Sequence, residues 1–202
     1  MIITMALHPS GHIAAAQVES TIRMLILVHS LALACVPVMF LGSWGLSRRF
    51  TSPSRAGIVG LVLYTFALLA VANAAVADGL VQPSLFRQTV AAMGSPTEID
   101  LWHKLSRYTF YWNQGYAQVF VAASSVAILV WSLGIWKSGN LARGLGVYGC
   151  VLGPVTVLAL FSGHLPLDAH GFGIVMLGQS VWFVVAGALL WSGDKPASVA
   201  SA

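Results

Sequence analysis

Charged residues are scarce in this chain, and their scarcity excludes most kinds of soluble protein. Lys, Arg, Asp and Glu make up only 8% of the 202 residues, whereas 57% of the residues are hydrophobic. In a soluble globular domain, about a quarter of the residues are charged. The composition therefore predicts an all-α membrane protein that crosses the bilayer several times, with residues 1–202 forming a single transmembrane domain.

A basic surface for nucleic acid is also missing. The net charge is +4, but the ten Lys and Arg residues are scattered over short connections and form no patch. Cysteine is equally scarce, because Cys35 and Cys150 are the only two and both lie within apolar runs. We expect no nucleic-acid partner, and we expect both thiols to stay reduced as small buried groups.

Five apolar runs are each long enough to cross a membrane, which takes about 20 residues in a helix. We interpret the first run as a membrane helix because it is longer than the core of a signal peptide and a basic stretch follows it. The predicted spans are residues 24–42, 57–77, 113–136, 144–163 and 172–191. In the fourth span, Gly149 and Gly153 have the spacing that allows close helix packing.

Residues 78–112 form the one long connection between predicted spans. Residues 81–93 look helical with one apolar face, and a Gly-Ser-Pro turn follows at 94–96. Thr97 and Asp100 then resemble the start of a second helical segment. The pattern predicts an interfacial amphipathic helix in this connection, leading directly into the third span and lying against the lipid bilayer.

The basic residues predict the orientation in the membrane. Three Arg residues follow the first span, and Lys137 and Arg143 flank the loop after the third span, whereas the turn at 164–171 holds neither Lys nor Arg. By the positive-inside rule, the first two of these loops are cytoplasmic. The N-terminus is then outside the cytoplasm and the C-terminus is inside.

With this topology, polar side chains gather in the outer half of the membrane. At the usual rise per residue, His29 lies roughly 8 Å and Asn73 roughly 6 Å below the outer face, Gln118 lies within the first two turns, and Gln179 lies roughly 10 Å deep. Because unsatisfied polar groups are costly in hydrocarbon, we expect these four side chains to face a shared cofactor pocket. The alternative is that they only form hydrogen bonds between helices.

The turn at 163–171 reads G-H-L-P-L-D-A-H-G and places two imidazoles and a carboxylate at the outer face. His164, Asp168 and His170 could bind one metal ion together with His29, and His103 is a reserve ligand. These ligand types suit zinc, copper or iron. The spacing matches no known zinc or iron signature, so a plain polar turn is the alternative.

The outer polar turn, the last span with Gln179 and its run V-W-F-V-V-A-G-A-L-L-W resemble those of small polytopic bacterial membrane proteins of unknown function. The likeness covers most of the last three spans. It implies a bacterial inner-membrane location and supplies no catalytic residues. The five-span layout is also similar to that of some haem-bearing anchors of respiratory enzymes. Such anchors use several intramembrane histidines for two haems, so here at most one haem b at the outer face is expected.

The sequence names no reaction, and whether the protein is an enzyme is left open. The first hypothesis is an outward-facing histidine site that binds a metal ion or haem, with a redox role as one option. The second is a non-enzymatic accessory or assembly subunit of a membrane complex. The third is a binding protein or transporter for a lipophilic ligand such as a quinone, in a pocket open to the outer leaflet. The odd number of spans and the lack of a visible repeat count against a transporter.

Overall fold

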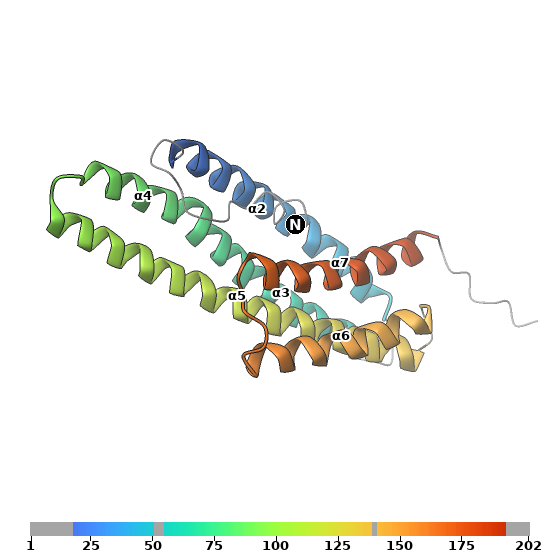
Figure 1. Cartoon of the computed structure of the whole chain (residues 1–202). Helices are drawn as coiled ribbons and strands as arrows, with labels where there is room; N and C mark the ends of the chain where they lie inside the picture. Colours follow the sequence, from blue (N-terminus) through green and yellow to red (C-terminus); the bar gives the residue numbers. More distant parts are fainter. Residues whose placement is uncertain (1–17, 51–54, 139–140, 193–202) are drawn as a thin grey trace, which may run out of the picture.

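The computed structural model of the chain describes residues 18–50, 55–138 and 141–192. All regular secondary structure in these ranges is helical. Five helical stretches are long and apolar enough to cross a membrane, and each overlaps one of the predicted spans. The prediction of an all-helical, multi-pass membrane protein is confirmed at this level (Figure 1).

The helices are joined by short connections. The elements are α2 (Val18–Arg48), α3 (Ala56–Val76), the π-helix η2 (Ala77–Val81), α4 (Gln82–Ala91), α5 (Pro96–Ser138), α6 (Arg143–Phe161) and α7 (Ala169–Trp191). α5 has 43 residues, which is about 65 Å of helix and about twice the thickness of the hydrocarbon layer. Figure 1 shows that α4 and the first part of α5 extend beyond α6 and α7.

The separate interfacial helix predicted for residues 78–112 is not confirmed. α3, η2 and α4 follow one another without a turn, and the later part of the connection is simply the start of α5. Pro83 does not end the helix because it lies in the first turn of α4, where a missing N–H is tolerated. The chain reverses near Gly94, whose φ of 116° is readily adopted by glycine, so the predicted turn is confirmed.

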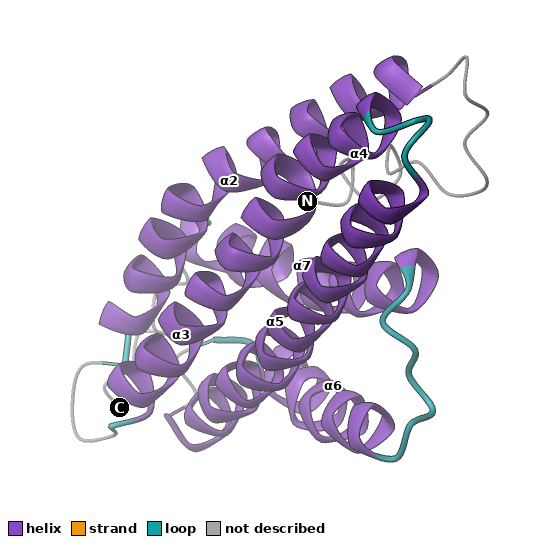
Figure 2. Cartoon of the chain, turned by 90° about the vertical axis from the view of Figure 1, so that its left-hand side faces the viewer, coloured by secondary structure: helices purple, strands orange, loops and turns teal. Residues whose placement is uncertain are grey.

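The core is aromatic and lies where α3, α5 and α7 meet. Trp131 of α5 and Trp182 of α7 stack with ring centroids 5.9 Å apart. The ring centroid of Tyr64 on α3 lies 5.5 Å from that of Trp131 and 4.9 Å from that of Phe183 on α7. Tyr64, Trp131 and Trp182 are almost completely buried. α5 therefore forms the centre of the bundle, with the other helices arranged around it (Figure 2).

Two glycines allow α6 to lie directly on α5. A Cβ atom at Gly149 would overlap the hydroxyl of Ser132, and one at Gly153 would lie 2.7 Å from the backbone oxygen of Ser125. The close helix packing predicted from these glycines is confirmed. The space left at Gly149 also accommodates the hydrogen bond in which the indole N–H of Trp182 donates to Ser132 Oγ at 3.1 Å.

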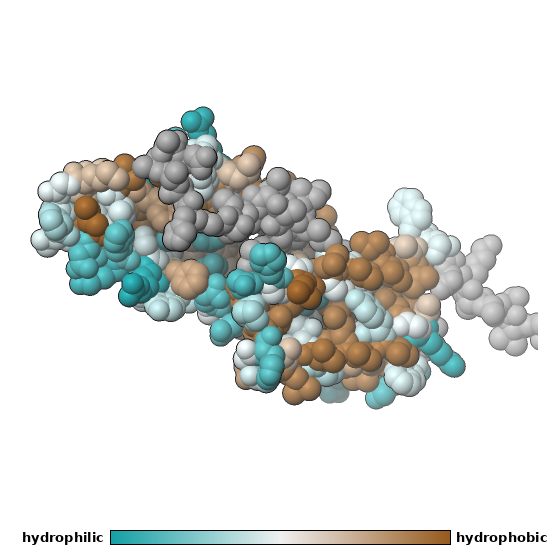
Figure 3. Space-filling model, in the orientation of Figure 1, coloured by the Kyte–Doolittle hydropathy of each residue, from teal (hydrophilic) through white to brown (hydrophobic). Residues whose placement is uncertain are grey.

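The surface differs along the length of the bundle. Figure 3 shows apolar side chains over α6 and α7, and hydrophilic ones toward the turn between α4 and α5. The apolar surface of α6 and α7 includes the exposed side chains of Leu158 and Ile174. An apolar outer surface is what a lipid-facing helix requires. Cys35 on α2 and Cys150 on α6 are both free thiols and half-buried.

Candidate functional site

The four polar residues predicted to share an outer pocket have different surroundings. Asn73 and Gln118 are exposed on the surface of their helices. The amide of Asn73 donates within its own helix, to the carbonyl of Leu69 at 2.8 Å. His29 is half-buried and Gln179 is only 2% exposed. Of the four, therefore, only His29 and Gln179 have buried environments in which a site could be built.

The predicted metal ligands are spread over several elements. His103, His164 and His170 are exposed, and His164 Nδ1 lies 2.8 Å from the hydroxyl of Ser162. Asp168 is the N-cap of α7, and its side chain accepts a hydrogen bond from the backbone N–H of Gly171 at 2.8 Å.

Within residues 18–50, 55–138 and 141–192, no three or more His, Cys, Asp or Glu side chains are grouped so that they could hold one ion. His29 and the histidines of the turn are therefore not brought together in a common metal centre there. Two further histidines considered from the sequence, at positions 8 and 12, lie outside the described residues.

His29 instead faces a carboxylate that sequence reasoning did not pair with it. Its Nε2 lies 3.2 Å from Asp78 Oδ2, and its Nδ1 lies 2.8 Å from the carbonyl oxygen of Leu25. Because a carbonyl can only accept, Nδ1 carries a proton. Nε2 then either donates to the carboxylate or accepts from the protonated acid. The available sequence signal is that both residues fall on the outer side, with His29 roughly 8 Å below the outer face and Asp78 at the start of the outer connection.

The backbone around Asp78 is unusual and tightly packed. Asp78 and Gly79 belong to the π-helix η2, and wider turns of this kind often mark functional sites in helices. A Cβ atom at Gly79 would overlap Cβ and Cγ of His29. The glycine thus lets α2 approach η2 closely enough for the imidazole to reach the carboxylate. The local sequence builds a polar contact between two membrane helices.

A second contact joins α2 to α4, nearer the N-terminal end of α2. Arg87 of α4 donates to Glu19 of α2 at 3.0 Å. Both side chains are at least half exposed, so solvent screens the pair and it contributes little to stability. The His29–Asp78 pair is better shielded, with side-chain exposures of 12% and 25%, and is the stronger polar link of α2 to the bundle.

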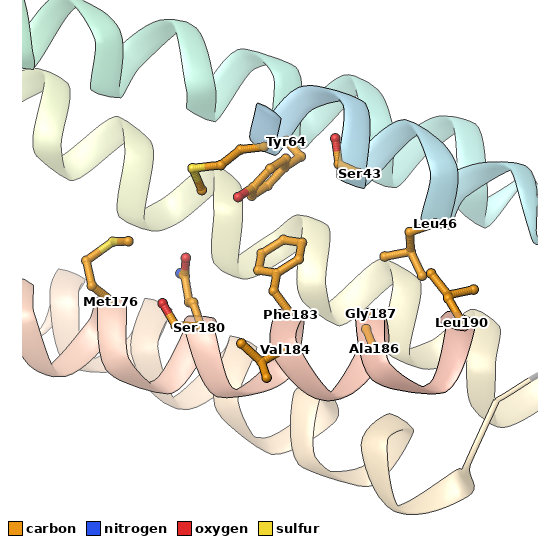
Figure 4. A pocket seen from close by; sticks show the side chains of 13 residues that line it. Ser43, Leu46, Tyr64, Met176, Ser180, Phe183, Val184, Ala186, Gly187 and Leu190 are labelled. Atoms are coloured by element: carbon orange, nitrogen blue, oxygen red, sulfur yellow. The ribbon is translucent and has the colours of Figure 1, made fainter. Parts of the chain in front are cut away.

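A groove of about 280 Å³ lies at the other end of the bundle, between α2, α3 and α7 (Figure 4). Apolar side chains form most of its wall, among them Met39 and Leu46 of α2 and Met176 and Leu190 of α7. Val184 on α7 also lines it and is 70% exposed, so the groove opens on the outside of the bundle. A molecule could therefore enter it sideways, from the surrounding bilayer.

Three polar groups of the groove have no hydrogen-bond partner in the described part of the chain. They are the hydroxyl of Tyr64, the hydroxyl of Ser180 and the side-chain oxygen Oε1 of Gln179. Figure 4 shows the hydroxyls of Tyr64 and Ser180 directed toward the space between α2 and α7. Tyr64 and Gln179 are residues only 1% and 2% exposed, and Ser180 is half-buried. Polar groups that face an apolar groove and have no partner of their own could orient a ligand there, which makes this cluster a candidate binding site.

The amide nitrogen of Gln179 is held by α5. Its Nε2 donates to Ser124 Oγ at 2.8 Å and to Ser125 Oγ at 3.2 Å. Sequence reasoning selected Gln179 but missed Tyr64 and Ser180, and it placed the pocket in the outer half. A tyrosine inside an apolar run was the available signal, because its hydroxyl needs a partner wherever the ring is buried.

Comparisons with protein-family models, with curated proteins and with solved structures give no match to this chain. The features from which function can be inferred are the groove and the His29–Asp78 pair.

Proposed function

We propose that the protein binds a lipophilic small molecule within the membrane, with the polar head group of that molecule in the groove between α2, α3 and α7. The observation that supports the proposal is the set of three polar groups, on Tyr64, Gln179 and Ser180, that line a mostly apolar groove and have no hydrogen-bond partner among the described residues. Ligand sites typically combine an apolar wall with a few converging polar groups that orient the ligand.

The size and position of the groove indicate which part of a ligand it would hold. Its volume of about 280 Å³ is just below the usual range of ligand pockets, which is about 300–1,000 Å³. It suits a single-ring head group, such as that of a quinone, while an apolar tail stays in the bilayer. The side opening at Val184 provides the path for that tail.

Filling the groove tests this proposal. Gly187 lines the groove, and a Cβ atom added there meets no atom within 4 Å, so leucine at this position should be tolerated by the fold. We expect Gly187→Leu to weaken binding of a short-chain benzoquinone or hydroquinone at least tenfold, measured by titration of the full chain in detergent.

The matched control is Gly173→Leu. Gly173 lies on the same helix, has similarly open space around it and does not line the groove. Binding in this variant should equal that of the unchanged protein. Equal loss of binding in both variants, or no effect of Gly187→Leu, would contradict the proposal.

We also propose that the groove lies in the cytoplasmic half of a bacterial inner membrane, with the N-terminus outside. The groove is at the end where α2 ends and α3 begins, next to the Arg residues of that connection. A reporter fused after residue 50 or 140 should be active in the cytoplasm, and one fused after residue 168 should be active outside. The reverse pattern would place the groove in the outer half.

The other two functions stay predictions. A metal ion or haem held by His29, His103, His164, Asp168 or His170 would show in metal analysis or in the absorption spectrum of the purified protein. An accessory role in a membrane complex would show as a stable partner after mild solubilisation. Neither has a grouping of described side chains in its favour comparable to the groove, so ligand binding comes first.

A further inference from the structure

We infer that the head group taken by the groove is a hydrogen-bond donor, that is, a hydroxyl such as those of a hydroquinone, and not a carbonyl such as those of the quinone. This inference rests on the proposed function. It specifies the chemical class of the ligand from the direction of the hydrogen bonds around Gln179.

The orientation of the Gln179 amide follows from its neighbour on α5. The hydroxyl of Ser124 donates its proton to the carbonyl of Val121 at 3.3 Å. Toward Gln179, at 2.8 Å, this hydroxyl can therefore only accept. The structure places the NH₂ group of Gln179 toward α5, in agreement with this, and its Nε2 also lies 3.2 Å from Ser125 Oγ.

The remaining atom of this amide is the oxygen Oε1, and it can only accept. No donor among the described residues forms a hydrogen bond with it, although Gln179 is 2% exposed and lines the groove. A ligand with a carbonyl at this point would place its oxygen beside Oε1 of Gln179, and because both atoms can only accept, no hydrogen bond would form. A ligand hydroxyl would instead donate to Oε1 and satisfy it.

The other polar groups of the groove accept either kind of ligand. The hydroxyls of Tyr64 and Ser180 can each donate or accept by rotating the O–H bond. They can hold the oxygen of a hydroxyl or of a carbonyl equally well. Discrimination between a hydroxyl and a carbonyl ligand therefore depends on Gln179. The hydroxyls of Tyr64 and Ser180 increase the affinity for both kinds of ligand.

The test compares three probes on the full chain in detergent under argon: a short-chain hydroquinone, its dimethyl ether and the corresponding benzoquinone. The hydroquinone should bind about tenfold more tightly than the other two, because only it supplies a donor to the buried acceptor. Equal affinities, or tighter binding of the quinone, would overturn the inference and leave the proposed function intact. Binding of none of the probes, or binding unchanged by Gly187→Leu, would refute the proposed function itself.

Two variants test whether Gln179 is the residue that distinguishes the hydroquinone from the other probes. Gln179→Met removes the acceptor and keeps a side chain of similar length, so the hydroquinone should lose its advantage over the dimethyl ether. Thr65→Val is the control, because Thr65 follows Tyr64 on α3, does not line the groove and donates its hydroxyl to the carbonyl of Leu61 at 2.8 Å. Thr65→Val should keep the tenfold preference. If the methionine variant does not fold, the three-probe comparison on the unchanged protein still decides the question.

Discussion

Replacing Gly79 by alanine should destabilise the protein by about 3 kcal/mol, the upper end of the usual cost of overpacking. The added methyl group would overlap Cβ and Cγ of His29, and Cβ is fixed by the backbone of α2, so no rotation of the side chain removes the overlap. α2 would have to move off the π-helix, and the contact between His29 and Asp78 would be lost. Thermal unfolding in detergent, followed by circular dichroism, measures the effect.

The control for this variant is Gly45→Ala on α2. A Cβ atom at Gly45 meets nothing within 4 Å, and alanine is the better helix former by about 1 kcal/mol. This variant should therefore be as stable as the unchanged protein or slightly more stable. Similar stabilities of the two variants would mean that α2 does not approach η2 as closely as the structure indicates.

The five spans could be predicted from the sequence because apolar length alone determines them. Runs of about 20 apolar residues have few alternatives to a membrane helix, and the glycine spacing at Gly149 and Gly153 reports directly on close helix contact. The turn near Gly94 was predicted for a similar reason, since Gly, Ser and Pro in sequence interrupt a helix. These are local signals, and they do not depend on how the helices are arranged.

The connection at 78–112 shows where local signals fail. Its polar composition predicted a separate surface helix, but nothing in residues 77–91 breaks the helix that begins at Ala56. A membrane helix continues into water as long as its backbone hydrogen bonds are kept, so composition marks the membrane boundary and not the helix end. The π-helix also changes the backbone hydrogen-bond pattern, and the side-chain pattern of these residues does not predict that change.

The candidate site depends on which side of its helix each polar side chain occupies. The depth of each residue in the membrane could be estimated from the sequence, but not the side of the helix on which it lies. Asn73 and Gln179 were placed at similar depths from the sequence, yet Asn73 is exposed and Gln179 is buried against Ser124. The groove depends on the gap between α2 and α7, two helices far apart in sequence (Figure 4). Tyr64 becomes a candidate only once its hydroxyl is seen to face that gap.

The pair of His29 and Asp78 should contribute to stability in a way that a double-mutant cycle can measure. Removing one partner of a buried ion pair costs about 3–5 kcal/mol, but Asp78 is 25% exposed, so we expect about 2 kcal/mol for Asp78→Ala after allowance for solvent screening. Asp78→Asn should lose less, because its side-chain oxygen can still accept from Nε2 of His29.

The cycle also separates this role of His29 from the metal or haem site predicted from the sequence. If His29 and Asp78 act as a pair, the loss in the double alanine variant should be smaller than the sum of the two single losses, by about 1–2 kcal/mol. If His29 chiefly holds a cofactor, His29→Ala should abolish a metal or haem signal whatever residue stands at position 78. Strictly additive losses of stability would mean that the carboxylate 3.2 Å from Nε2 does not bind the imidazole, and that packing against Gly79, not the polar contact, holds His29 beside η2.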